Sequence, residues 1–247
     1  MKPDSRLVEI FKEMLFFCSR GLTSPAPVFV MNNDRETILK LSENILTYWL
    51  DRIPDELPLP HLDIEETPSY ANAMKDFIPV LTKWKAKNYG LSISDIKLFR
   101  EVFAEVDLRN LLALLGMRLT PGSIITPDLH LPIESILLEA ATQPYNRNLT
   151  VASRELSKHI LRSEKRFWGE IEGSGDEKNA YSKNKLQSIF EDKTWSNIFG
   201  HFKHKSVYEI RVESGHGARW TLKDGIKFIG FVEPFESVKH MKKSPKQ

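Results

Sequence analysis

The feature that most constrains the fold is a change of hydrophobic period near residue 207. Before this point apolar residues recur mainly at three- and four-residue intervals, the spacing of amphipathic helices. From Val207 onward apolar and polar residues alternate, as in strands that bury one face. Segments 207–213, 218–222 and 226–232 therefore predict three strands joined by glycine-containing turns. The sequence predicts an α+β protein, mainly helical, with a C-terminal three-stranded antiparallel β-meander packed on helices.

The helical part is divided by capping residues and by glycine or proline breaks. We expect no sheet of consequence within residues 1–150, because the apolar spacing there is helical. The predicted helices span residues 7–18, 35–53, 69–88, 95–115, 132–142, 151–168 and 177–192. This pattern predicts a helical region over 1–145, an α+β region over 146–236 with the meander at 207–232, and a disordered basic tail over 237–247.

Composition limits the classes of partner. Hydrophobic residues make up 41% of the chain and charged residues 28%, which is typical of a globular protein. The net charge of +2 is too small to require nucleic acid or a membrane surface. Residues 1–150 carry 16 basic and 20 acidic side chains, whereas 151–247 carry 19 and 13, so the basic excess lies in the C-terminal part.

Targeting signals and reactive cysteines are not evident. Acidic residues interrupt the N-terminal apolar run, and no segment approaches the roughly 20 apolar residues of a membrane span. We therefore expect no membrane partner and a cytoplasmic or nuclear location. The single cysteine, Cys18, follows two phenylalanines and is predicted to be a buried structural residue.

Turn chemistry predicts the register of the meander. A three-residue loop at 223–225, closed by a left-handed Gly225, places Trp220 opposite Phe228. An odd-length loop at 214–217 places Trp220 opposite Ile210 and Arg219 opposite Arg211. All three strands then share one apolar face.

The opposed arginines allow two interpretations. Either Glu209, Glu213 or Glu233 neutralises them and the face is solvated or covered, or they grip an anion such as phosphate or a carboxylate. The predicted anion site contains Arg211, Arg219, His216 and Lys227.

Part of the C-terminal region resembles a family of uncharacterised proteins. The resemblance rests on the segment 215–220, Gly-His-Gly-Ala-Arg-Trp, and on 228–234, Phe-Ile-Gly-Phe-Val-Glu-Pro. Segments 167–169 and 195–199 also fit it. The resemblance implies that 150–235 is one unit, and it implies no activity.

Three histidines allow a different kind of site. His201 and His204 are three residues apart, and His216 follows across a predicted strand. Imidazoles at this spacing could share a helical face and bind zinc. The segment lacks the glutamate and the four-residue spacing of the zincin helix, so the alternative is that the histidines are partly buried hydrogen-bonding groups.

The helix predicted from residue 151 is rich in base. Arg154, Lys158, Arg162 and Lys165 recur at four-residue steps, which predicts either a solvated face or a surface for nucleic acid or an acidic partner.

No cofactor motif is present, and we expect no cofactor. From these patterns we expect a non-enzymatic interaction module that holds an anionic ligand or an acidic or phosphorylated protein on its basic C-terminal surface. The alternatives are a hydrolase or metal-dependent enzyme centred on His201, His204 and His216, and a nucleic-acid-binding protein in which Trp195 and Phe231 stack on bases if they are exposed.

Overall fold

The computed structural model describes residues 2–161 and 166–235 and divides the chain into two compact units. The first unit contains the chain up to Leu57, Glu66–Thr120 and Ile124–Leu131. The second contains Pro58–Glu65, Pro121–Ser123 and the chain from Pro132 onward. The predicted disordered tail over 237–247 lies outside the described residues.

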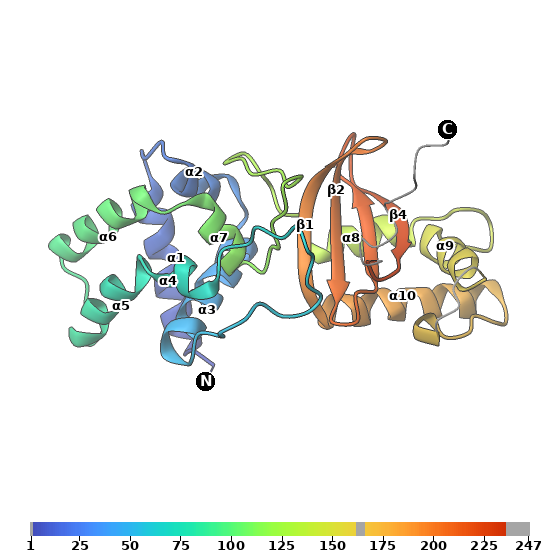
Figure 1. Ribbon diagram of the computed structural model, residues 1–247, viewed down its shortest axis with the longest axis horizontal. Helices are drawn as coiled ribbons and strands as arrows, with labels where there is room; N and C mark the ends of the chain where they lie inside the picture. The colour runs from blue at the N-terminus through green and yellow to red at the C-terminus, as the bar shows by residue number, and fades with distance from the viewer. Residues whose placement is uncertain (1, 162–165, 236–247) are drawn as a thin grey trace, which may run out of the picture. The chain divides into compact units, whose positions relative to one another are not determined.

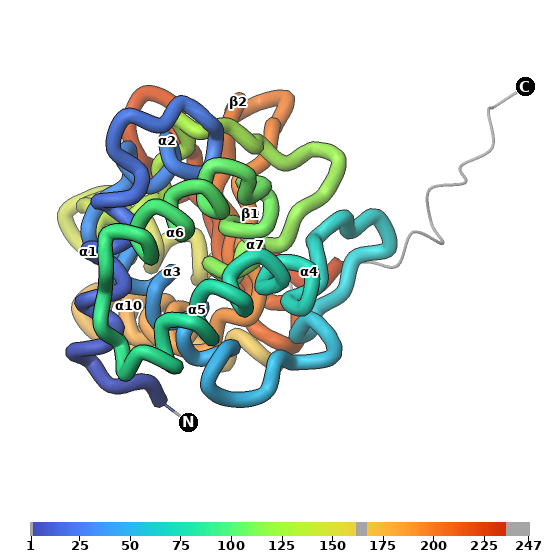
Figure 2. The backbone as a smooth tube through the Cα atoms, turned by 90° about the vertical axis from the view of Figure 1, so that its left-hand side faces the viewer, coloured from blue at the N-terminus to red at the C-terminus, as the bar shows by residue number. Residues whose placement is uncertain are grey.

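In the described residues of the first unit, the regular elements are all helices, joined by loops. Its helices are α1 (Ser5–Ser19), α2 (Pro25–Asn32), α3 (Arg35–Leu50), α4 (Tyr70–Met74), α5 (Phe77–Ala86), α6 (Ile93–Glu105) and α7 (Leu108–Leu114). The trace in Figure 2 follows the chain from α5 through a turn into α6. Between residues 2 and 150 the structure has isolated bridges and no strand, which confirms the prediction that this stretch contains no sheet of consequence.

Local signals explain where these helices begin and end. Asp34 caps α3 by accepting from the Thr37 amide at 2.8 Å, as its position predicts. The helix expected over 95–115 is two helices, because Asp107 caps a new start at α7. The first of them, α6, is capped by Ser92 in a capping box with Asp95, so it begins two residues before the predicted start at residue 95.

The core of the first unit is aromatic. Phe11 lies edge-on to Phe99 and stacks near Trp84, and Phe99 stacks on Phe103. All four rings are buried. Cys18 is buried on the same helix as Phe11, as predicted, and burial raises the pKa of its thiol to about 11.

The second unit is a four-stranded antiparallel sheet with helices. Its elements are α8 (Glu134–Thr142), α9 (Val151–Ile160), a short 3₁₀ turn η1 (Arg166–Trp168), α10 (Gly175–Glu191), β1 (Lys193–His201), β2 (Lys205–Val212), β3 (Gly217–Thr221) and β4 (Lys227–Val232). The strands lie side by side in sequence order (Figure 1). The α+β class is confirmed, but the sheet has four strands and not three. The strand that was missed, β1, is buried over residues 195–198 on both of its faces, so its sequence does not alternate.

Trp220 anchors the face of the sheet that packs on helices. It is 0% exposed, stacks on Phe190 of α10, and donates from its indole N–H to the Leu137 carbonyl of α8 at 2.9 Å. It lies opposite Phe228, as the three-residue loop at 223–225 predicts. On its other side it lies opposite Tyr208 and not Ile210.

The β2–β3 register is two residues away from the expected one. Gly215 adopts a φ of +84° and closes the turn, and the Val212 amide donates to the His216 carbonyl at 2.9 Å. Gly217 is already in the strand, where a Cβ would lie 1.9 Å from the Ile210 carbonyl oxygen. A shift of two residues keeps every side chain on its predicted face but changes its partner. The predicted opposition of Arg211 and Arg219 is therefore wrong: Arg219 lies opposite Glu209, and Arg211 lies opposite Gly217.

No helix in the described part of the chain combines the length and apolar character needed to span a bilayer.

Candidate functional site

A carboxylate at the end of the sheet lies close to three aromatic ring nitrogens. Glu233 follows β4, and its Oε1 atom lies 2.8 Å from His159 Nε2 and 2.9 Å from Trp168 Nε1. Its Oε2 atom lies 3.2 Å from His216 Nε2. An ionised carboxylate only accepts hydrogen bonds, so His159 donates to Glu233 from Nε2.

Aromatic packing supports this carboxylate. The His216 ring stacks on Phe167 with centroids 3.9 Å apart, and His159 meets the Trp168 ring edge-on at 4.8 Å. η1, which carries both aromatic rings, is attached to α10 by the Tyr181 hydroxyl, which donates to the Trp168 carbonyl at 2.7 Å. Lys185 donates to the Phe167 carbonyl at 2.7 Å, and burial lowers the pKa of its amine.

A hollow of about 230 Å³ lies between α9 and the sheet on the exposed side of His159. Helix α9 contributes Glu155, Lys158 and His159, which one helical turn brings onto a common face. The sheet contributes Arg219 and the β4 residues Ile229 to Val232. α9 and β4 are neighbours in Figure 1. The hollow therefore combines an imidazole, a carboxylate and two cations.

A β-bulge shapes the floor of this hollow. Arg219 pairs with Gly230 whereas Trp220 pairs with Phe228, so Ile229 is an extra residue in β4. The bulge lies beside Arg219, and its residues Ile229 and Gly230 line the hollow. Bulges are common beside active sites, where they redirect a side chain.

Arg219 is held in place by a buried acid. Glu209 is 1% exposed and accepts from Arg219 Nε at 2.5 Å through Oε2, and from Arg211 Nε at 2.6 Å through Oε1. The Arg219 side chain is 26% exposed and reaches the hollow, whereas Arg211 is 3% exposed. Arg211 also donates to the Gly215 carbonyl at 2.5 Å and to the Glu233 carbonyl at 2.6 Å. Burial lowers the pKa of Arg211, and Glu209 opposes that shift.

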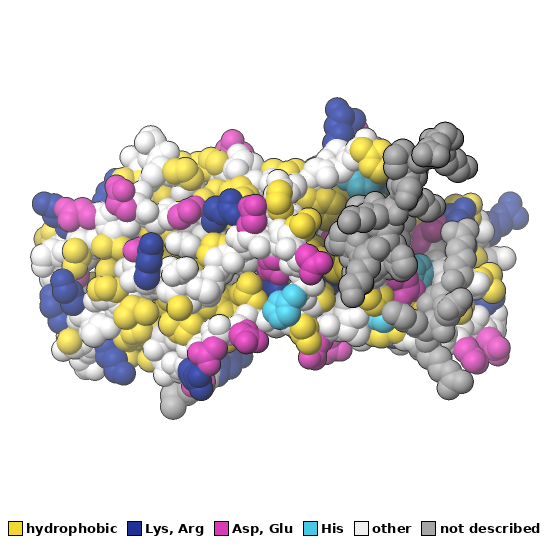
Figure 3. Space-filling view, viewed as in Figure 1, with side chains coloured by type: hydrophobic (Ala, Val, Ile, Leu, Met, Phe, Trp, Pro, Cys, Tyr) yellow, Lys and Arg dark blue, Asp and Glu magenta, His cyan; other side chains and the backbone are white. Residues whose placement is uncertain are grey.

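The structure separates the residues of the predicted anion site. Arg219 lies in the hollow, Arg211 is buried behind it, His216 is buried against Phe167, and Lys227 is exposed at the start of β4. Basic and acidic side chains of the described residues are interspersed on the face shown in Figure 3, so they form no continuous basic patch there.

The histidines predicted to bind metal do not converge. His201 and His204 lie together at the β1–β2 turn with ring centroids 5.1 Å apart, but His216 is held by Ser214 and Glu233. His201 ends a strand, so the expected shared helical face is wrong. The described residues include no group of three or more His, Cys, Asp or Glu side chains arranged to hold a metal ion.

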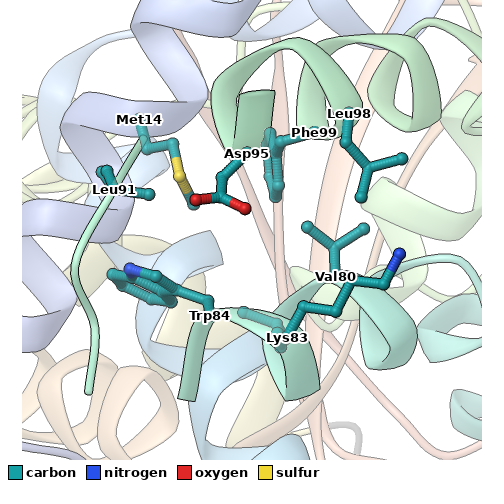
Figure 4. A pocket seen from close by; sticks show the side chains of 9 residues that line it. Met14, Val80, Lys83, Trp84, Leu91, Asp95, Leu98 and Phe99 are labelled. Atoms are coloured by element: carbon teal, nitrogen blue, oxygen red, sulfur yellow. The ribbon is translucent and has the colours of Figure 1, made fainter. Parts of the chain in front are cut away.

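Another cavity, in the first unit, is too small for a ligand. Met14, Val80, Trp84, Phe99 and neighbouring side chains converge on it (Figure 4). It offers about 10 Å³, the space of a single water molecule. Asp95 at its rim forms an ion pair with Lys87, with 2.5 Å between Oδ1 and Nζ.

Sequence reasoning missed the centre of the site. His159 and Glu155 lie on the helix whose spacing predicts only a basic face, and the pattern around Glu233 predicts only an acid that neutralises the arginines. The one available signal was local: Glu155, Lys158 and His159 follow a Thr150 cap at helical spacing. Arg162 and Lys165 of that predicted basic face lie outside the described residues.

The comparisons with known proteins point to the same part of the chain. No curated protein and no solved structure matches at a significant level. One family model does match, and it contradicts the expected non-enzymatic, anion-holding module because the family is named for an enzyme. Residues 138–233, less than half of the chain, match the family model of the CdiA C-terminal tRNase toxin domain.

Proposed function

We propose that the second unit is a ribonuclease that cleaves tRNA at the hollow between α9 and β4. One observation carries this proposal: His159, Glu155, Lys158 and Arg219 line a single hollow, with Glu233 behind His159, inside the segment that matches a tRNase toxin domain. These side chains supply the groups that cleavage of an RNA phosphodiester requires: a proton acceptor, a proton donor and cations.

The reaction follows from the chemistry of these groups. The ribose 2′-oxygen attacks the adjacent phosphorus, forming a P–O2′ bond while the P–O5′ bond breaks. Glu155 takes the proton of the 2′-hydroxyl, and His159 gives a proton to the departing 5′-oxygen. The products are a 2′,3′-cyclic phosphate and a 5′-hydroxyl, and the requirement for a 2′-hydroxyl restricts the substrate to RNA.

The cations act on the charge of the phosphate. Charge accumulates on the non-bridging oxygens as phosphorus becomes five-coordinate, and prepositioned cations stabilise that state. Arg219 is suited to this role because Glu209 fixes its guanidinium before substrate arrives. Lys158 Nζ lies 3.2 Å from Glu155 Oε1, so one of the cations also lies beside the proposed base.

The test is cleavage of a tRNA mixture by the full chain and by His159→Ala. We expect the substitution to lower kcat by roughly 10²- to 10⁴-fold, the usual contribution of a general acid. The matched control is His130→Ala, which removes an exposed histidine of the first unit and should leave cleavage unchanged. Full activity in His159→Ala, or no cleavage by the unaltered chain, contradicts the proposal.

Two further measurements separate the roles. A substrate with sulfur in place of the 5′-oxygen needs no proton on its leaving group. It should therefore restore cleavage by His159→Ala but not cleavage by Glu155→Gln. Products ending in a 3′-hydroxyl and a 5′-phosphate would show that water, and not the 2′-hydroxyl, attacks phosphorus.

A further inference from the structure

The most exposed large hydrophobic side chain in the second unit lies at the turn between β1 and β2. Phe202 is 97% exposed, the highest value among the large hydrophobic side chains of the described residues. A phenyl ring held in water gains nothing from the hydrophobic effect, and the turn does not need it for packing. Lys203 and Lys205, which follow it in the chain, are also exposed, so the turn presents an aromatic ring together with two cations.

This aromatic ring is part of an ordered stack. The His201 ring packs on Phe202 with centroids 4.8 Å apart and planes 27° apart. His201 is itself fixed, because its Nδ1 accepts from the backbone amides of Lys203 and His204 at 3.2 Å each. A nitrogen that accepts carries no proton, so His201 is the neutral tautomer with hydrogen on Nε2.

The stack lies on the same face of the sheet as Arg219. His201 follows Phe199 by two residues on β1, and the Arg219 guanidinium lies 5.6 Å from the centre of the Phe199 ring. Partial burial, and then the charge of Arg219, lower the pKa of His201, which keeps the ring neutral at pH 7. Phe199, which contacts Arg219 at the hollow, and His201, which stacks on Phe202, therefore project from the same face of β1.

We propose that Phe202, backed by His201, is a stacking platform for an unpaired base of the RNA that is cleaved at the hollow. The inference rests on the proposed ribonuclease function and adds the substrate class: RNA with unpaired nucleotides, as in a loop, and not continuous duplex. Unstacked bases bind aromatic side chains through their faces, and lysines beside the ring attract the backbone phosphates. Bases inside a duplex are already stacked on one another and cannot reach the ring.

The test measures binding of the full chain to a short single-stranded 2′-O-methyl RNA, which the proposed mechanism cannot cleave. Phe202→Ala should weaken binding by roughly 5- to 150-fold, the range found for losing one base–aromatic stack. Phe202→Trp should retain or improve it. The matched control is Phe17→Ala, which removes a 54% exposed phenylalanine of the first unit and should leave affinity unchanged.

The result separates this inference from the function on which it rests. Equal affinity of Phe202→Ala and the unaltered chain, or a duplex of the same sequence bound as tightly as the single strand, overturns the platform even if tRNA is cleaved. Loss of single-strand binding in Phe202→Ala supports the platform even if no RNA is cleaved. In that case only the proposed ribonuclease activity and its catalytic residues are contradicted.

Discussion

Glu209 on β2 lies directly opposite Arg219 on β3, and its carboxylate binds the guanidiniums of both Arg219 and Arg211. The Glu209 carboxylate compensates both positive charges and holds the two arginine side chains in place. Arg211 fastens the β2–β3 turn and the chain after β4, while Arg219 reaches the hollow beside His159. Structure and proposed catalysis thus share a single buried ionic network.

Replacing Glu209 should destabilise the second unit. Glu209→Gln removes the charge that compensates a buried guanidinium, and breaking a buried ion pair on one side costs about 3–5 kcal/mol. Urea unfolding monitored by tryptophan fluorescence measures the change. Glu213→Gln removes an exposed acid from the end of the same hairpin and should change stability by no more than about 0.5 kcal/mol. Equal stability of the two variants would mean that Arg211 finds another partner.

Trp220 should be the most costly aromatic residue to remove from the sheet. Trp220→Ala deletes a ring that is 0% exposed and leaves a cavity between α8, α10 and the sheet, at a cost of about 3–5 kcal/mol. Trp220→Phe keeps an aromatic ring but leaves the Leu137 carbonyl without its donor, which predicts an intermediate loss. Thermal unfolding of the three proteins gives the order, and a Phe variant as unstable as the Ala variant would contradict it.

Glu233 should act on catalysis through His159. Glu233→Gln keeps the size of the side chain but removes the charge that orients the imidazole, so kcat for tRNA cleavage should fall by roughly 10- to 100-fold with little change in KM, because the group acts in the transition state. The fold is monitored by circular dichroism. A rise in KM with unchanged kcat would instead indicate that Glu233 serves substrate binding.

Cys18 should make the stability of the first unit sensitive to alkaline pH. The folded-state pKa of the thiol is raised from 9.0 to about 11. The contribution of the neutral, buried thiol to the free energy of unfolding is therefore fully present below pH 9 and is lost as the pH rises through 11. The loss approaches roughly 3 kcal/mol at the upper end, at 1.36 kcal/mol per unit of pKa.

The comparison variant is Cys18→Ala, which lacks the titrating thiol while other groups still titrate. The difference between the two stability curves should therefore grow between pH 9 and pH 11. Parallel curves would show that the thiol ionises as readily in the folded as in the unfolded chain. In the folded protein at pH 8, the thiol should also resist alkylation until denaturant is added.

The sequence by itself determined the class of fold and the faces of most strands. Capping residues and helical spacing locate α1 and α3, and strict alternation puts Trp220 and Phe228 on the buried face, because both signals act between residues close in the chain. Parity also explains why an error of two residues in the β2–β3 register left every side chain on its predicted face.

Only the tertiary structure decided which residues meet. β1 escaped detection because its middle is buried on both sides, and burial on two sides removes the alternation that marks a strand. His159 and Glu233 lie 74 residues apart in the chain, and nothing local links an imidazole on a basic helix to an acid after the last strand. They are joined because α9 packs beside β4 and η1 holds Trp168 against the same carboxylate. Long-range packing of this kind depends on the whole core, so a reading of spacing along the chain cannot supply it.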